Sequence, residues 1–184
     1  SSFAKSIAQS ISNRIINDKI DESFLPEDAN YISDILASAG LLHDIGNPPF
    51  GHFGEDTIRG WFEEKLEEMV IENPITNKFE KLSEVLNPQM RGDFLNFEGN
   101  AQAIRLVAKL HFLIDENGMN LTYALLNTLI KYPVDSLNIN KNSGNIKDKK
   151  MGYYLSEEDL FEAIVEGTGT LNEKTGEICR HPLT

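Results

Sequence analysis

The sequence predicts an all-α protein that forms a single domain. In several separate stretches, apolar residues recur every three or four positions, which is the period of an amphipathic helix. The alternation typical of strands is confined to residues 169–178, where we expect at most a small hairpin. With 184 residues, of which 40% are hydrophobic, the chain is long enough to bury one sizeable core.

The predicted helices follow one another along most of the chain. Their apolar stripes cover residues 3–15, 32–42, 52–69, 97–114, 121–131 and 160–165. Gly46 and the Asn-Pro-Pro that follows it end the second helix, and Ser156 with Asp159 has the form of a capping box before the last one. We expect polar loops at 73–93, which contains two prolines, and at 138–150, which is rich in Asn and Lys.

The charge balance is strongly acidic. The chain has 29 acidic and 17 basic residues, for a formal net charge of -12, which argues against a broad binding surface for nucleic acid. A polyanionic ligand would have to be held by a few local cations. The single cysteine, Cys179, excludes an intramolecular disulfide framework and fits a reducing compartment, so we expect a cytoplasmic protein. No apolar run reaches the roughly 18 residues needed to cross a bilayer, so we expect no membrane association.

His43 and Asp44 stand at the end of an apolar helix and directly before a turn. An imidazole beside a carboxylate is a mixed nitrogen and oxygen donor pair, which is compatible with Zn, Fe, Mn or Ni. Taken alone, however, the dipeptide is more often an ordinary polar helix end than a metal site.

His52 and Glu55 are three residues apart at the start of the next predicted helix, so their side chains share one face. A carboxylate behind an imidazole fixes its tautomer and raises its basicity, as a general acid or base requires near neutral pH. The alternative is that Glu55 is a first-turn acid that complements the helix dipole and His52 is an ordinary first residue.

One long motif resembles a known family. Residues 39–55, AGLLHDIGNPPFGHFGE, resemble the signature of the dGTPase-like deoxynucleoside triphosphate triphosphohydrolases of the HD superfamily. Three further segments are similar to the same family and follow in its order: NFEGNAQAIRLVAKL (96–110), MNLTYALLNTLIKYP (119–133) and KMGYYLSEEDLF (150–161). Because these segments cover most of the chain, the resemblance implies an HD-domain helical bundle over residues 1–184.

The resemblance also implies an activity. It is the hydrolysis of a deoxynucleoside triphosphate, such as dGTP, to the deoxynucleoside and inorganic triphosphate by attack of water at the α-phosphorus. His43 and Asp44 would be ligands of a divalent metal ion (Mn, Mg or another transition metal), and His52 with Glu55 would transfer the proton. The resemblance further implies a homo-oligomer.

Four more residues resemble substrate-binding positions of the family: Lys131, Tyr132, Lys150 and Asn100. The lysines would offset part of the charge of the triphosphate. The simpler alternatives are that Lys131 complements the dipole at a helix C-terminus, that Lys150 is a solvated loop charge, and that Asn100 caps a helix.

The sequence also departs from the family pattern. An HD site uses a further histidine upstream and a further aspartate well downstream of the His-Asp pair, yet no histidine precedes His43 and the last aspartate is not apparent. We therefore expect the chain to be truncated at both ends and to hold half of the metal shell. Two alternatives stay open: an HD phosphohydrolase of another nucleotide, and a non-catalytic fragment for nucleotide binding or assembly.

Overall fold

A computed structural model describes residues 2–111 and 116–184 of the chain, and its architecture is mostly helical. The helices are α1 (Ser2–Asn17), α2 (Asp28–Leu42), α3 (His52–Lys65), α4 (Leu82–Val85), α5 (Pro88–Leu95), α6 (Gly99–Arg105) with its π-helical continuation η1 (Leu106–Leu110), α7 (Tyr123–Leu129) and α8 (Glu158–Thr168), with short 3₁₀ turns η2 (Ile146–Asp148) and η3 (Leu155–Glu157). The predicted all-α fold class is confirmed.

Two short antiparallel hairpins accompany the helices. Strand β1 (Val70–Glu72) pairs with β2 (Phe79–Lys81), with Ile71 opposite Glu80. Strand β3 (Leu171–Asn172) pairs with β4 (Glu177–Ile178), so the small hairpin expected within residues 169–178 is confirmed.

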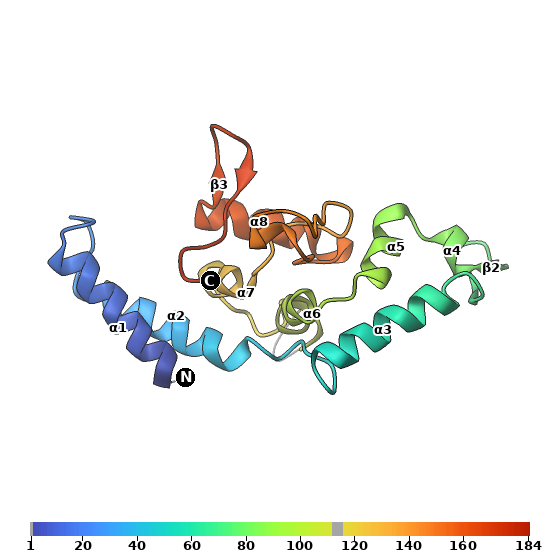
Figure 1. Cartoon of the computed structure of the whole chain (residues 1–184), viewed down its shortest axis with the longest axis horizontal. Coiled ribbons are helices and arrows are strands. Elements are labelled where there is room, and N and C mark those ends of the chain that lie inside the picture. The colour runs from blue at the N-terminus through green and yellow to red at the C-terminus, as the bar shows by residue number, and fades with distance from the viewer. Residues whose placement is uncertain (1, 112–115) are drawn as a thin grey trace.

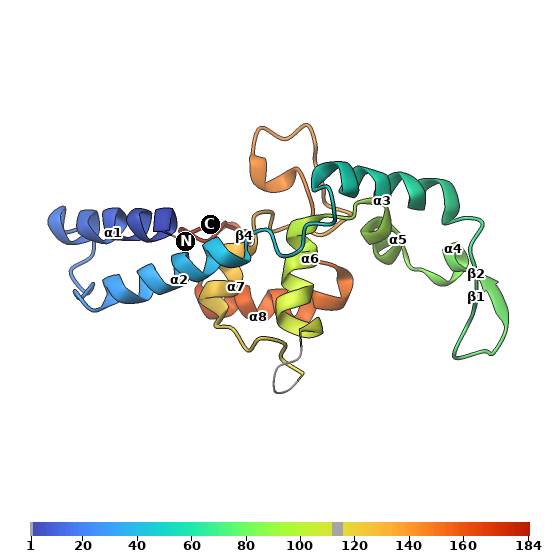
Figure 2. The same ribbon diagram turned by 90° about the horizontal axis from the view of Figure 1, so that it is seen from below.

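The core lies at the centre of an elongated molecule. Helices α6, α7 and α8 form this centre, the α1–α2 pair extends to one side, and α3, α5 and the β1–β2 hairpin extend to the other (Figures 1 and 2). The core residues are Ile104, Val107, Ala108, Leu126, Leu129, Ile130, Tyr153, Phe161, Ile164 and Val165. Burial of each large apolar side chain contributes about 1.5–3 kcal/mol. Ala39 and Leu42 of α2 pack against the same core, which brings the end of α2 next to α7.

The loop between α2 and α3 lies tightly against the start of α6. A β-carbon on Gly46 would overlap the carbonyl oxygen of Gly99 and the backbone nitrogen of Ala103. Only glycine fits at position 46 without backbone movement, because both obstacles are main-chain atoms. This close approach holds the loop that carries His43 and Asp44 on α6.

Parts of the sequence prediction are wrong or incomplete. Residues 73–93, which we expected to be a polar loop, contain β2, α4 and most of α5. Asn87 caps α5 by accepting a hydrogen bond from the Met90 N–H, and Pro88 occupies the first turn, where its missing N–H costs nothing. The capping box at Ser156 does not form, since α8 begins after Glu157 without a side-chain cap. Residues 112–114 of the predicted helix lie outside the described residues.

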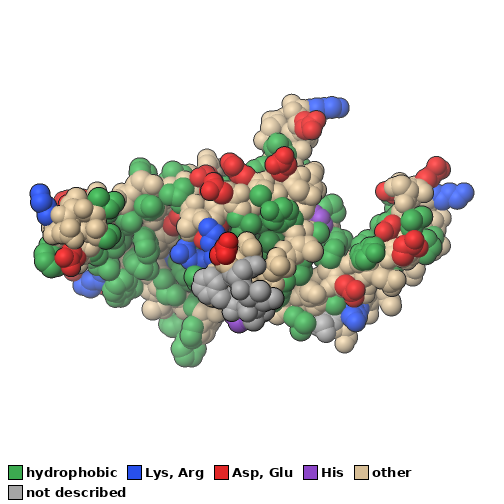
Figure 3. All heavy atoms as spheres, turned by 180° about the vertical axis from the view of Figure 1, so that it is seen from behind, with side chains coloured by type: hydrophobic (Ala, Val, Ile, Leu, Met, Phe, Trp, Pro, Cys, Tyr) green, Lys and Arg blue, Asp and Glu red, His purple; other side chains and the backbone are tan. Residues whose placement is uncertain are grey.

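Large apolar side chains are exposed on both extensions of the molecule. Figure 3 shows hydrophobic surface over each of them, and the most exposed residues include Phe3 on α1 and Ile75 and Phe79 in the β1–β2 hairpin. In the part of the chain that the structure describes, no helix is long and apolar enough to span a membrane.

Candidate metal and catalytic site

A cavity of about 380 Å³ lies where the ends of α2 and α7 meet the starts of α3 and α6. Five of the eight residues singled out from the sequence line it: His43, Asp44, His52, Asn100 and Lys131. Glu55 and Tyr132 are buried and do not line the cavity, and Lys150 lines an adjoining one. His52 and the His43-Asp44 pair thus line the same cavity.

His43 and Asp44 directly follow the last residue of α2. His43 Nδ1 lies 3.1 Å from the carbonyl oxygen of Gly40, a distance that suits an Nδ1–H donor, and His43 Nε2 lies 2.9 Å from Asp44 Oδ2. The amide of Asn47 donates to the other carboxylate oxygen, Asp44 Oδ1, over 2.9 Å. Both side chains are about two-thirds exposed, at 65% and 67%, so they remain accessible to a ligand.

The chemistry of this pair fits a cation. When His43 Nδ1 carries the proton for Gly40, Nε2 of the neutral ring presents a lone pair to the lone pairs of Asp44 Oδ2. That arrangement is favourable only with a positive charge beside it, either a second proton on the imidazole or a metal ion. The 2.9 Å separation is close to that of two neighbouring ligands of one divalent ion at about 2.1 Å. Among the described residues, however, no group of three or more His, Cys, Asp or Glu side chains could hold a metal.

His52 and Glu55 lie in the first turn of α3 and contact each other as their spacing predicted. His52 Nδ1 is 2.8 Å from Glu55 Oε2. The two side chains differ sharply in environment, because the imidazole of His52 is 81% exposed whereas the carboxylate of Glu55 is 1% exposed. With Nδ1–H donated to Glu55, Nε2 of His52 is left to exchange a proton with a molecule in the cavity.

Glu55 is kept ionised in spite of its burial. Burial raises the pKa of its carboxyl, but hydrogen bonds from His52 and from the backbone N–H of Gly99, with the charge of Lys150 nearby, outweigh that effect and hold the pKa below its ordinary value. The Gly99 N–H lies 2.9 Å from Glu55 Oε1. A carboxylate with a lowered pKa can accept the Nδ1–H of His52 and stabilise an imidazolium.

A second buried carboxylate, Glu98, belongs to the same region. It is 1% exposed, its Oε2 lies 2.8 Å from Lys150 Nζ, and its Oε1 accepts a hydrogen bond of 2.7 Å from the Asn100 amide. Arg59 Nη1 lies 3.9 Å from Glu98 Oε2. An acidic residue in the Phe-Glu-Gly-Asn segment was a visible signal, but its partners are distant in sequence, so spacing could not reveal them.

The two lysines both lie near one aromatic ring. Lys131 Nζ is 5.7 Å and Lys150 Nζ is 5.9 Å from the ring centroid of Tyr132, which is itself buried. Lys131 lines the cavity with His52, whereas Lys150 lines the adjoining cavity of about 330 Å³ together with Arg59 and Glu98. The substrate contacts expected of Tyr132 and Lys150 therefore stay predictions.

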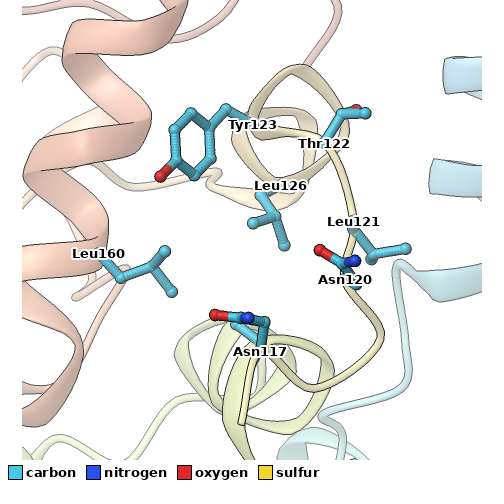
Figure 4. A pocket seen from close by; sticks show the side chains of 8 residues that line it. Asn117, Asn120, Leu121, Thr122, Tyr123, Leu126 and Leu160 are labelled. Atoms are coloured by element: carbon cyan, nitrogen blue, oxygen red, sulfur yellow. The ribbon is translucent and has the colours of Figure 1, made fainter. Parts of the chain in front are cut away.

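Two further cavities contain none of the residues singled out from the sequence. The pocket in Figure 4, of about 400 Å³, lies between η1, α7 and α8 and is lined by Leu126, Leu160, Tyr123 and neighbouring side chains. A mostly apolar cavity of about 530 Å³ lies between α3, α5 and α6 and includes Phe62 and Phe94. Neither is lined by a residue singled out from the sequence.

Comparison with known proteins defines the class. Residues 10–138 match the model of the HD domain family, so the chain belongs to the HD domain family. The His-Asp pair and His52 fall within this matched range, and the predicted family resemblance is confirmed.

Individual relatives carry more specific names. The whole chain is 50% identical to a deoxyguanosinetriphosphate triphosphohydrolase-like protein of Listeria innocua, and 86% of it is 38% identical to a protein of the same name from Pseudomonas aeruginosa. Over 97% of its length it is 37% identical to the deoxyguanosinetriphosphate triphosphohydrolase of Serratia proteamaculans. The chain spans 33–37% of the length of these relatives.

Proposed function

We propose that the full-length protein hydrolyses deoxynucleoside triphosphates, with dGTP or a similar nucleotide as substrate, to the deoxynucleoside and inorganic triphosphate. The observation that carries the proposal is the convergence of His43, Asp44, His52 and Lys131 on one cavity. The names of the relatives support the same reaction class.

His43 and Asp44 are the residues that would hold a divalent metal ion such as Mn or Mg. When bound, the ion supplies a Lewis acid and a positive charge for the phosphate. Asn47 fixes the carboxylate through its 2.9 Å hydrogen bond, and Gly40 orients the imidazole of His43. Such supporting contacts preorganise metal ligands and strengthen binding.

His52 transfers the proton in this proposal. Attack of water at the α-phosphorus breaks the bond between phosphorus and the 5'-oxygen, and the reaction needs a partner for the proton of the water or of the leaving oxygen. Nε2 of His52 is free for that task because Nδ1 is held by Glu55 at 2.8 Å. The ionised Glu55 stabilises the imidazolium that forms when His52 takes the proton.

Local cations bind the triphosphate in this proposal. The chain has a formal net charge of -12, so attraction of a polyanion depends on positioned groups rather than on the overall field. Lys131 and Asn100 line the cavity, and Lys150 lies near the same Tyr132 ring as Lys131. These contacts account for substrate binding, while His52 accounts for turnover.

The test uses the purified full-length protein with each deoxynucleoside triphosphate and Mn²⁺ or Mg²⁺, and separates products by anion-exchange chromatography. Release of intact triphosphate that is lost in His52→Ala supports the proposal. Release of pyrophosphate or orthophosphate assigns the protein to another class of HD phosphohydrolase, and binding without turnover assigns a non-catalytic role.

We also propose that the protein acts in the cytoplasm as a homo-oligomer. Light scattering coupled to size-exclusion chromatography measures the oligomeric state of the full-length protein, and cell fractionation measures its location. A monomer, or recovery in the membrane or secreted fraction, contradicts this part of the proposal.

A further inference from the structure

Two buried carboxylates and two cations form one group behind His52. Glu55 and Glu98 are each 1% exposed. Lys150 Nζ lies 2.8 Å from Glu98 Oε2 and 3.9 Å from Glu55 Oε2, and Arg59 lies 3.9 Å from an oxygen of each carboxylate. The four formal charges cancel, as buried charges require.

The two cations are not held equally. Arg59 donates hydrogen bonds of 2.6 Å both to Asp56 and to the carbonyl oxygen of Phe97, so its guanidinium is anchored at two points besides the carboxylates. Lys150 has its closest ion-pair contact with Glu98. Its position on a flexible four-carbon side chain therefore depends on Glu98 far more than the position of Arg59 does.

His52 and Lys150 both approach the same oxygen atom of Glu55. Glu55 Oε2 accepts the His52 Nδ1–H at 2.8 Å, and the same oxygen faces the ammonium of Lys150 at 3.9 Å. A modest shift of the lysine would place a strong charged donor on the oxygen that orients His52. The other oxygen, Oε1, is already used by the Gly99 N–H.

We propose that Glu98 is a positioning residue that retains Lys150 and thereby leaves Oε2 of Glu55 to His52. The inference rests on the proposed proton-transfer role of His52, which it deepens. Glu98 touches neither the imidazole nor the cavity that contains it, so its effect on His52 passes through Lys150 and Glu55.

The variant Glu98→Gln tests the role of the negative charge of Glu98. Glutamine keeps the shape of the side chain and an oxygen that can accept from Asn100, but it no longer holds the ammonium, and Lys150 then pairs with Glu55. We expect kcat to fall about tenfold, because His52 loses its fixed tautomer and orientation, while KM rises no further than in Lys150→Met, in which the proposed phosphate contact is lost altogether.

Removal of the lysine should reverse this loss. Lys150→Met alone is expected to raise KM, since Lys150 is proposed to bind the triphosphate. In the Glu98→Gln, Lys150→Met double variant, kcat should return to the value of the Lys150→Met single variant, because no ammonium competes for Glu55. A purely structural role of Glu98 predicts instead that the two losses in kcat add.

The reactivity of His52 gives a readout that does not depend on turnover. Diethyl pyrocarbonate modifies the neutral imidazole of exposed histidines, and peptide mass spectrometry measures the rate at His52 with exposed His111 as the internal reference. We expect the rate at His52 to change severalfold in Glu98→Gln and to return to the wild-type rate in the double variant. If the wild-type protein hydrolyses no nucleotide, the proposed function fails, yet these rates still decide the inference.

Glu157→Gln is the matched control. Glu157 is also 1% exposed and lies near two cations, with Arg105 at 3.6 Å and Lys109 at 4.0 Å, but it does not line the His52 cavity. Its kcat and its His52 modification rate should equal those of the wild type. If Glu98→Gln does not fold, the test uses the Glu98→Gln, Lys150→Met double variant and the Lys150→Met single variant. In both, the rate of His52 modification should match that of the wild type. Unchanged His52 reactivity in folded Glu98→Gln, additive losses in kcat, or a His52 rate in the double variant or in Lys150→Met that differs from the wild type would overturn the proposal.

Discussion

The backbone N–H of Gly99 donates to the buried carboxylate of Glu55 over 2.9 Å, although the two residues are 44 positions apart in the sequence. A β-carbon at position 99 would lie 2.8 Å from Glu55 Oε1 and 2.5 Å from Asn47 Oδ1, so any larger residue would displace these two side chains where α3, α6 and the α2–α3 loop meet. The orientation of Glu55, and through it of His52, is therefore set by contacts between elements rather than by the helix alone.

His52→Ala in the full-length protein should lower kcat by about 10²- to 10⁴-fold, which is the usual contribution of a positioned acid or base. Bound metal should be retained, because His52 pairs with Glu55 while His43 pairs with Asp44. Steady-state kinetics and elemental analysis of the same preparation measure the two quantities. Loss of one equivalent of metal would reassign His52 to the metal shell.

Lys131→Ala should raise KM for the nucleotide about tenfold while kcat changes less, since the lysine supplies a charge to the bound triphosphate rather than a proton. Lys174→Ala is the control, because Lys174 is an exposed residue of the β3–β4 turn and does not line the cavity. Both variants are compared by initial rates over a range of substrate concentrations. An equal change in KM for the two variants would show that only the net charge matters.

Asp93→Asn should change how stability depends on pH. Asp93 is buried, and although the Leu155 N–H donates to its Oδ2, burial raises the pKa of its carboxyl above the ordinary value of 3.8. The folded protein then binds the proton more tightly than the unfolded chain, so the free energy of unfolding falls as pH rises from 3.8 through the folded pKa, by up to about 1.4 kcal/mol per pH unit.

Asparagine lacks this titration. The stability of Asp93→Asn relative to wild type should therefore increase with pH across that window and then level off, as measured by urea denaturation from pH 3.5 to 7.5. Asp159→Asn, at an exposed site in the first turn of α8, serves as the control. A difference in stability between Asp93→Asn and wild type that is independent of pH would contradict the assignment.

The 184-residue chain on its own should bind divalent metal weakly and release little triphosphate. Among its described residues no group of three or more ligand side chains occurs, and affinity depends on ligand number and a preorganised shell. Calorimetric titration with Mn²⁺ and an assay for triphosphate release test both points. Turnover comparable to that of the full-length protein would mean that this chain contains a complete site.

The sequence predicted most of the helices because their apolar periodicity is a local property. It failed at α5, where the signal was a polar cap and a proline, Asn87-Pro88, inside a stretch that otherwise lacked periodicity. The β1–β2 hairpin was missed for a related reason, since each strand has three residues, too few for a recognisable alternation.

For the site, a continuous motif predicted His43, Asp44, His52 and Glu55, whose contacts join residues one or three positions apart. The contacts of Glu98 could not be predicted from the sequence, because they join it to Arg59 and Lys150 from other parts of the fold. Such pairs depend on how α3, α6 and the segment before η3 pack together, which local patterns do not encode.

The close approach of Gly46 to α6 also has a consequence for sequence variation. Every other side chain at this position meets main-chain atoms of Gly99 and Ala103, which no rotamer change can move aside. A saturation library at position 46, scored for folded protein, should therefore recover glycine almost alone, while the exposed neighbour Ile45 tolerates many replacements. We therefore expect Gly46 to be retained during evolution of this protein, although it takes no part in the proposed chemistry.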